Sequence, residues 1–265
     1  MNGMVARPAF STELWEYREL LRALVVRNLK MRYQRSLLGF GWALLNPLMT
    51  VIVLVVVFDA ILRIQVEQYW AFLISGFFPW VFVLHTLGTS SGQITSHSYM
   101  ARSLAFPSEV LVLSGVLSRL VEFAAELLLV VLVLIALRHQ GMPAAFLLLP
   151  LVVVIQVVLT TGLALPVAAL GVFFQDVQHA LPVALTLLSY LTPIYYPLSY
   201  VPERFRVIYG LNPFVGLINL YHAILYEGRV PSLLEFLVPV LVSLLCFGVG
   251  LLLYRWKREY FAEVV

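Results

Sequence analysis

Long uninterrupted apolar runs dominate this sequence and constrain its fold more than any other feature. Six of them approach or exceed the length of a membrane span: residues 38–62, 69–87, 110–137, 144–174, 180–197 and 233–254. A transmembrane helix needs about 20 apolar residues, whereas the strands of a membrane barrel are short and alternate between apolar and polar residues. Of all residues 62% are hydrophobic and only 12% are charged, which is more apolar surface than a soluble core can bury. The sequence therefore predicts an all-α polytopic membrane protein with six transmembrane helices.

Positive charges are distributed unevenly between the two sides that six spans define. The side with both termini carries eleven of them: Arg7, Arg18, Arg22, Arg27, Lys30, Arg32, Arg35, Arg102, Arg255, Lys257 and Arg258. The opposite loops carry five: Arg63, Arg138, Arg204, Arg206 and Arg229. Because short loops rich in Lys and Arg stay in the cytoplasm, we expect both termini on the cytoplasmic face.

The amino-terminal segment is predicted to contain an amphipathic helix over residues 12–35. Apolar side chains gather on one face of this helix and charged ones on the other. This pattern is typical of a helix that lies in the membrane interface, and it also suits a helix packed on a partner subunit. Gly39 and Gly41 permit a sharp turn from this helix into the first span. The chain thus divides into a tail with the interface helix (1–36), a membrane domain (37–256) and a cytoplasmic tail (257–265).

The segment between the last two spans, residues 198–230, is too apolar and aromatic for a solvated loop. Four prolines between positions 193 and 213 exclude one long helix. We expect two short helices, near 203–209 and 214–226, that re-enter the membrane from the outer side and form a gate. The tyrosines of this region form either an interfacial aromatic belt or a channel surface that stacks on sugar rings. Residues 190–230 contain Tyr190, Tyr195, Tyr196, Tyr200, Tyr209, Tyr221 and Tyr226, and the candidates for the channel or outer gate are Tyr190, Tyr195, Tyr196, Tyr200 and Tyr221.

Three charged residues, Arg119, Glu122 and Glu126, lie inside the third span. Their spacings of three and four residues place them on one face of a helix. Charges are costly in lipid and usually face a partner or a water-filled cavity. Either the span extends well into the cytoplasm, with Arg119 near the headgroups, or the residues form an intrahelical pair at a subunit contact.

Signatures of catalysis are absent from the sequence. A phosphate-binding loop needs a Gly-Lys pair, but the two lysines, Lys30 and Lys257, follow Leu and Trp. The five histidines are too scattered to suggest a metal site. A lipid-linked glycosyltransferase, the enzyme alternative, would need paired carboxylates on a loop, where only Asp176 and Glu203 are candidates. We therefore expect a protein that is not an enzyme and binds no cofactor itself.

Several short motifs occur in an order and spacing that are together fairly specific. They are RNLKMRYQRSLLGFGWALLNPL at 27–48, FPSEVL at 106–111, FFQDV at 173–177, LTPIYYP at 191–197, VPE at 201–203 and LNPF at 211–214. Through them the chain resembles, over nearly its whole length, the membrane permease subunits of ABC exporters for polysaccharides such as lipid-linked O-antigen.

This resemblance implies a homodimer in a bacterial inner membrane, with a channel at the dimer interface. It implies two separate cytoplasmic ABC ATPase subunits, which bind ATP and Mg²⁺, and no nucleic-acid partner. The substrate would be a polyprenyl-diphosphate-linked polysaccharide, moved through the channel among membrane lipids. The ATPases would dock on the amino-terminal helix and on the segment at 90–105.

Candidate site residues follow from the resemblance and from the charge pattern together. The coupling candidates are Ser96, His97, Tyr99, Arg102 and Asp176. The candidates for attracting the lipid diphosphate are Arg27, Lys30, Arg32 and Arg35, because Arg and Lys make charge-assisted contacts with phosphate.

Two positions depart from the family pattern, since Gln175 and His222 stand where members often carry Arg. Alternative substrates remain open: a teichoic acid, a capsule polysaccharide or a small drug could use the same fold and the same ATPase partner. A secondary transporter would usually show inverted repeats and polar sites at the membrane midplane, and the sequence shows neither clearly.

Overall fold

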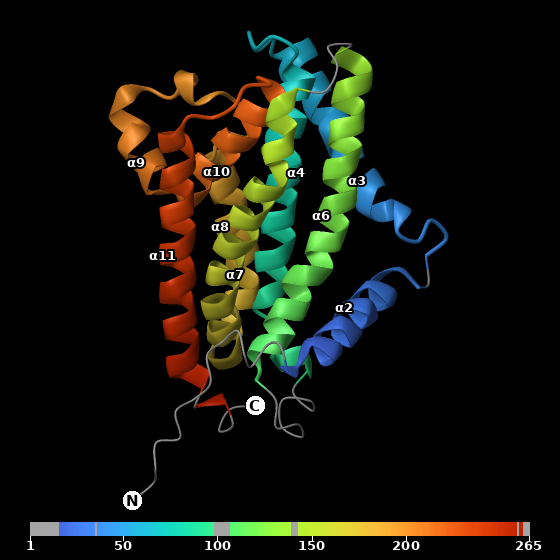
Figure 1. Cartoon of the computed structure of the whole chain (residues 1–265), viewed down its shortest axis with the longest axis vertical. Coiled ribbons are helices and arrows are strands. Elements are labelled where there is room, and N and C mark those ends of the chain that lie inside the picture. Colours follow the sequence, from blue (N-terminus) through green and yellow to red (C-terminus); the bar gives the residue numbers. More distant parts are fainter. Residues whose placement is uncertain (1–15, 35, 98–106, 139–142, 259, 262–265) are drawn as a thin grey trace, which may run out of the picture.

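The described part of the chain consists of helices joined by turns and loops. The structure is a computed structural model that describes residues 16–34, 36–97, 107–138, 143–258 and 260–261. No strand occurs within these ranges. The α-helices are α2 (Arg18–Tyr33), α3 (Gly41–Val55), α4 (Tyr69–Ser90), α6 (Glu109–Arg138), α7 (Leu149–Phe173), α8 (Asp176–Tyr190), α9 (Arg206–Leu211), α10 (Pro213–Tyr221) and α11 (Leu233–Arg258). Shorter 3₁₀ and π-helical turns are η1 (Val56–Ile61), η2 (Thr95–His97), η3 (Ala144–Leu148), η4 (Leu198–Tyr200), η5 (Glu203–Phe205) and η6 (His222–Tyr226). The all-α prediction is therefore confirmed for these residues, and Figure 1 shows the longer helices standing side by side as a bundle.

Within the described ranges, five helices are long and apolar enough to cross a membrane: Gly41–Ile61, Tyr69–Ser90, Glu109–Leu137, Ala144–Phe173 and Leu233–Arg258. They match five of the six spans expected from the apolar runs. Of the most apolar 18-residue stretch of α4, 83% is buried inside the protein, whereas the corresponding share is 11% for α3 with η1 and 17% for α11. The central helix is thus α4, and α3 and α11 present apolar side chains outward, as helices bounded by lipid do.

The sixth expected span differs from the prediction. Instead of a helix over 180–197, the structure has α8, which begins at Asp176 and ends at Tyr190. Its 15 residues reach about 22 Å, less than the roughly 30 Å of the hydrocarbon core. Asp176 favours an early start because a carboxylate stabilises the positive end of a helix. The helix stops early because Pro193 disfavours helical backbone at Thr192, and the Asn212 side chain donates to the carbonyl of Leu191 at 2.9 Å.

Between α8 and α11 the chain forms a bent pair of short helical segments, Glu203–Leu211 and Pro213–Tyr226, with an angle of 98° between them. Asn212 begins the second segment, since its Oδ1 accepts a hydrogen bond from the Phe214 backbone N–H at 3.0 Å. Pro213 follows at the first helical position, where its missing N–H has no cost. The prediction of two short helices here is confirmed, with boundaries within a few residues.

This outer hairpin, residues 203–226, enters and leaves the bundle at the same end of α4. Phe214 meets Trp80 about halfway along α4, with ring centroids 5.4 Å apart. Tyr226 then donates to the carbonyl of Glu67 at 2.7 Å, just before α4 begins. The hairpin therefore reaches the middle of the bundle and returns, rather than passing through.

Helix α2 lies across the opposite end of the bundle (Figure 1). Leu24 is buried against Val110 and Leu111 of α6, with Tyr17, Leu20 and Leu21 alongside. The chain turns from α2 into α3 at Gly39, whose φ of +51° is a left-handed conformation that glycine adopts without strain. At the same end, Arg258 of α11 donates to Glu109 of α6 at 2.7 Å, so the first and last described helices share one end of the bundle.

Two glycines, Gly162 and Gly250, allow α7 and α11 to pack closely. A Cβ added to Gly250 would lie 1.8 Å from the carbonyl oxygen of Gly162. Small residues allow such close approach in membrane proteins, where packing rather than hydrophobic burial holds helices together. This contact fixes α11 on the side of the bundle away from α2.

Candidate functional site

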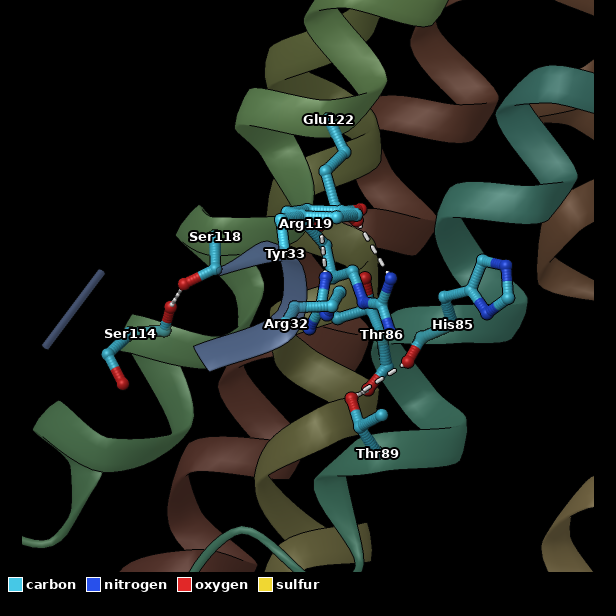
Figure 2. Close-up of polar contacts among 9 residues, drawn as sticks. All are labelled: Arg32, Tyr33, His85, Thr86, Thr89, Ser114, Ser118, Arg119 and Glu122. Carbon is cyan, nitrogen blue, oxygen red and sulfur yellow. Dashed lines mark hydrogen bonds and ion pairs between the residues drawn. The ribbon is translucent and has the colours of Figure 1, made fainter. Parts of the chain in front are cut away.

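Three donors from two helices converge on one carboxylate, that of Glu122 (Figure 2). Arg32, in the last turn of α2, pairs with Oε1. Tyr33 also donates to Oε1, at 2.8 Å. Arg119, one turn before Glu122 on α6, donates to Oε2 at 2.7 Å. We call Arg32, Tyr33, Arg119 and Glu122 the α2–α6 clasp.

The clasp forms because the apolar face of α2 is already docked nearby. Leu24 anchors α2 on the start of α6, and Asn28 donates to Ser114 at 3.3 Å one turn further along both helices. The next turn of α2 brings its basic end beside Glu122. That carboxylate is almost fully buried, with 6% of its side chain exposed. Burying a carboxylate without partners is costly, and the three donors offset this cost.

Tyr33 is held as a hydrogen-bond donor by its surroundings. Partial burial and the hydrogen bond to Glu122 raise the pKa of its hydroxyl to about 12. The phenol therefore remains protonated throughout the physiological range.

A cavity of about 200 Å³ adjoins the clasp. Its lining comes from four helices: Arg32, Tyr33, Trp42, Ala43, Asn46, Pro47, His85, Arg119, Glu122 and Glu126. Within α4, the two exposed residues are His85 and Thr89, one helical turn apart and both polar. A lipid-facing surface would carry apolar side chains here, so this patch suits a polar path or a protein contact.

The predicted diphosphate-attracting residues are separated by the structure into two groups. Arg27 and Lys30 lie exposed on α2 and line one groove along that helix with Arg22. Arg32 instead points to Glu122 and belongs to the clasp. Arg35 lies outside the described residues.

Three of the predicted coupling residues, Ser96, His97 and Asp176, are described, and they lie at the same end of the bundle as α2. Ser96 is exposed in η2, which also contains His97, and Asp176 is exposed at the start of α8. The two segments are neighbours, because a Cβ on Gly92 would contact the Gln178 side chain at 3.8 Å. Tyr99 and Arg102 lie outside the described residues.

The predicted gate tyrosines have different environments. Tyr190 and Tyr200 are exposed, and Tyr195 and Tyr196 are half-buried. Tyr195 stacks between Tyr190 and Phe58, with centroid distances of 5.7 and 6.2 Å. Tyr221 is fully buried, and its hydroxyl donates to Gln156.

Sequence reasoning missed a neutral polar network beside Tyr221. Gln156 of α7 donates to the carbonyl of Pro79 at 2.8 Å. His222 lies 2.7 Å from Ser75 Oγ and donates through Nε2 to the Pro193 carbonyl at 2.8 Å. It also stacks on Phe72 at 4.2 Å. The available signal was the isolation of Ser75 and Gln156 within apolar runs, since buried polar side chains need partners. We call these residues the outer network.

Chemically, the clasp and its cavity can hold charge but offer no catalytic arrangement. Among the described residues, no three His, Cys, Asp or Glu side chains converge as metal ligands. The guanidinium groups can bind an anion, and the exposed polar patch on α4 lies beside them.

Comparison with known sequences gives one consistent result. A sequence model of the family described as ABC-2 type transporter matches residues 19–226. An O-antigen export system permease protein of Myxococcus xanthus is 34% identical over 96% of this chain and 98% of its own length. An O-antigen export system permease protein of Klebsiella pneumoniae is 27% identical over 93% and 95%. A polysialic acid transport protein of Escherichia coli is 24% identical over 90% and 93%.

Proposed function

Because the chain belongs to the ABC-2 type transporter family, we propose that it is the membrane subunit of an ATP-driven exporter of a lipid-linked polysaccharide. The observation that carries this proposal is the near end-to-end similarity to a relative named as an O-antigen export permease. The motif-based resemblance to this family is confirmed by the same similarity. Relatives named for O-antigen and for polysialic acid both align over at least 90% of the chain, so the glycan class rather than one glycan is proposed.

The energy for transport comes from separate ATPase subunits that bind ATP and Mg²⁺. They dock at the end of the bundle that holds α2, where Ser96 of η2 and Asp176 of α8 are both exposed. Because α2 lies across this end of the bundle, it is suited to transmit a movement of the ATPase subunits to the membrane helices. The same end carries most of the cations, so it faces the cytoplasm of a bacterial inner membrane.

The polysaccharide passes through a channel formed with a second copy of the chain. Support comes from α4, whose exposed residues, His85 and Thr89, are polar although the helix is otherwise buried. A surface of this kind is costly against lipid but suits a hydrated path. At the outer end, the hairpin of α9 and α10 re-enters the membrane, and the exposed Tyr190 and Tyr200 flank the exit. Rings of this type can stack on sugars.

The basic face of α2 attracts the diphosphate of the lipid carrier. Arg27 and Lys30 remain exposed there, and each cation near an anionic surface contributes about 1 kcal/mol. Replacing Arg27, Lys30, Arg32 and Arg35 together with Gln is expected to abolish export while the dimer still assembles. The matched control replaces Arg204, Arg206 and Arg229 at the other end, where export should continue. Unchanged export in the first variant would reject this role.

The function itself is tested by deleting the gene and measuring surface polysaccharide. Loss of the surface glycan, with lipid-linked glycan accumulating inside the cell, is the expected result. Restoration should require both this chain and its ATPase. A normal glycan surface combined with drug sensitivity would instead identify a small-molecule exporter of the same fold.

A further inference from the structure

The α2–α6 clasp contains more hydrogen-bond donors than acceptors. A guanidinium has five N–H donors, and Arg32 and Arg119 each direct one of them to Glu122. Arg119 Nε is buried and has no hydrogen-bond partner among the residues described. Buried polar atoms without partners are rare in native proteins and need an explanation. An anion with several oxygens would use these donors.

The adjoining cavity has room for such an anion, and its lining combines two arginines with the carboxylates of Glu122 and Glu126. Its volume of about 200 Å³ far exceeds the roughly 10–15 Å³ that one water needs on this measure. Asn46 supplies an amide and His85 an imidazole at its wall, and Trp42 supplies an aromatic ring that is 51% exposed. A diphosphate fits the donors, and the ring of an attached sugar could stack on Trp42.

Glu122 already acts as an anion for both arginines. Its carboxylate accepts from Arg32, Tyr33 and Arg119, the groups that an incoming phosphate would use. Guanidinium groups pair with carboxylate and phosphate through the same planar geometry. The two anions therefore compete for the same donors.

We propose that this cavity is the binding site for the diphosphate of a polyprenyl-linked sugar, and that Glu122 is an internal counter-anion which the diphosphate displaces. The inference rests on the proposed function and adds the site to it. Displacement of Glu122 removes the charged contact between the end of α2 and α6, so an occupied site loosens this end of the helix on which the ATPase docks.

The test measures binding of polyprenyl diphosphate to the purified full-length chain in nanodiscs of neutral lipid, without ATP. Glu122→Gln keeps the size of the side chain but removes its charge, so the competitor is weakened. We expect about tenfold tighter binding, the factor given by one charge-assisted hydrogen bond. Arg119→Gln should weaken binding by a similar factor. Folding of each variant is checked by its elution and thermal unfolding.

A matched control exists on the same helix. Glu109 is buried and pairs with Arg258 at 2.7 Å, but it lies outside the cavity lining. Glu109→Gln removes the same charge from an arginine pair and should leave binding unchanged. If Glu122→Gln weakened binding or left it unchanged, the competition would be refuted. Equal tightening in both Glu→Gln variants would also refute it, because a general charge effect would then suffice.

Two further ligands distinguish the sources of the phosphate. Inorganic pyrophosphate should bind more weakly than polyprenyl diphosphate but respond to the same substitutions, and polyprenol without phosphate should not respond. Equal affinity for pyrophosphate would assign the site to free diphosphate and overturn its role in substrate entry. The binding assay needs neither ATP nor export. The proposed binding site can therefore be refuted while the proposed export function holds, and the export function can be refuted while the binding site holds.

Discussion

The clasp at the α2 end of the bundle contains three side chains with formal charges, whereas the outer network contains none. The clasp joins two helices through Arg32, Arg119 and Glu122 beside a cavity. The outer network joins α4, α7 and the hairpin through Gln156, Tyr221 and His222. Charge pairs can exchange partners with a charged ligand, while neutral side chains bonded in a packed core have no competing partner. The comparison indicates that the α2 end of the bundle, with the clasp, is movable and that the end with the outer network is fixed.

The largest effect is expected from Gln156→Leu in the outer network. The change leaves the Tyr221 hydroxyl buried without an acceptor and the Pro79 carbonyl without this donor. Orphaned buried polar groups cost about 1–3 kcal/mol each, so we expect a loss of about 3 kcal/mol in the free energy of unfolding. Thermal unfolding in detergent measures it. Adding Tyr221→Phe should restore part of the loss, and a fully additive double variant would disprove the network.

A smaller global effect is expected from Gly76→Ala. The new Cβ would lie 2.8 Å from His222 Cε1, and this ring cannot move freely because it stacks on Phe72 and bonds at both nitrogens. Overpacking of this kind costs about 1–3 kcal/mol. Gly88→Ala is the control on the same helix, since nothing lies within 4 Å of its added Cβ. Equal melting temperatures for the two variants would show that this end is not rigid.

At the movable end, Glu122→Ala should act locally. It removes the acceptor shared by Arg32, Tyr33 and Arg119, while the apolar contact of Leu24 with α6 remains. We expect about tenfold faster amide exchange in α2, with exchange in α4 and α10 unchanged, because local opening does not need global unfolding. Hydrogen exchange with mass spectrometry makes the measurement. Faster exchange throughout the bundle would erase the contrast between the two ends.

The smallest effect concerns alkaline pH. The pKa of Tyr33 is raised to about 12 from the ordinary value of 10.0, so the folded state holds this proton more tightly than the unfolded state. Docking of α2 should be fully stable below pH 10 and should weaken as the pH rises toward 12. The Tyr33→Phe variant should lack this transition. The measurement is amide hydrogen exchange of α2 in the wild type and in Tyr33→Phe, corrected for intrinsic exchange rates. It tests whether the docking of α2 weakens, as expected, when the pH rises.

Much of the fold could be predicted because apolar runs encode spans directly. The span expected at 69–87 is α4, Tyr69–Ser90, and the span expected at 144–174 is η3 with α7. The early end of α8 could not be predicted from periodicity, since it depends on Asn212 bonding the Leu191 carbonyl from 21 residues away. Tertiary contacts of this kind override local pattern.

The charged residues of the candidate site could be predicted from the sequence, but the pairing of Arg32 with Glu122 could not. The charges of Arg119, Glu122 and Arg32 were visible in the sequence, and the intrahelical contact between Arg119 and Glu122 follows from their spacing. The bond from Arg32 to Glu122 spans 90 residues, so only the packing of α2 on α6 could reveal it. For Arg32 the charge pattern predicted an attraction to lipid, while the structure shows that it is already engaged.

The central claim is that this chain forms a polysaccharide path but depends on another protein for energy. The most direct test reconstitutes the purified chain in liposomes, with and without its ATPase, and follows a labelled polyprenyl-diphosphate glycan across the membrane. The account predicts transport only when the ATPase and ATP are both present. Transport by the chain alone, or driven by an ion gradient, would contradict it.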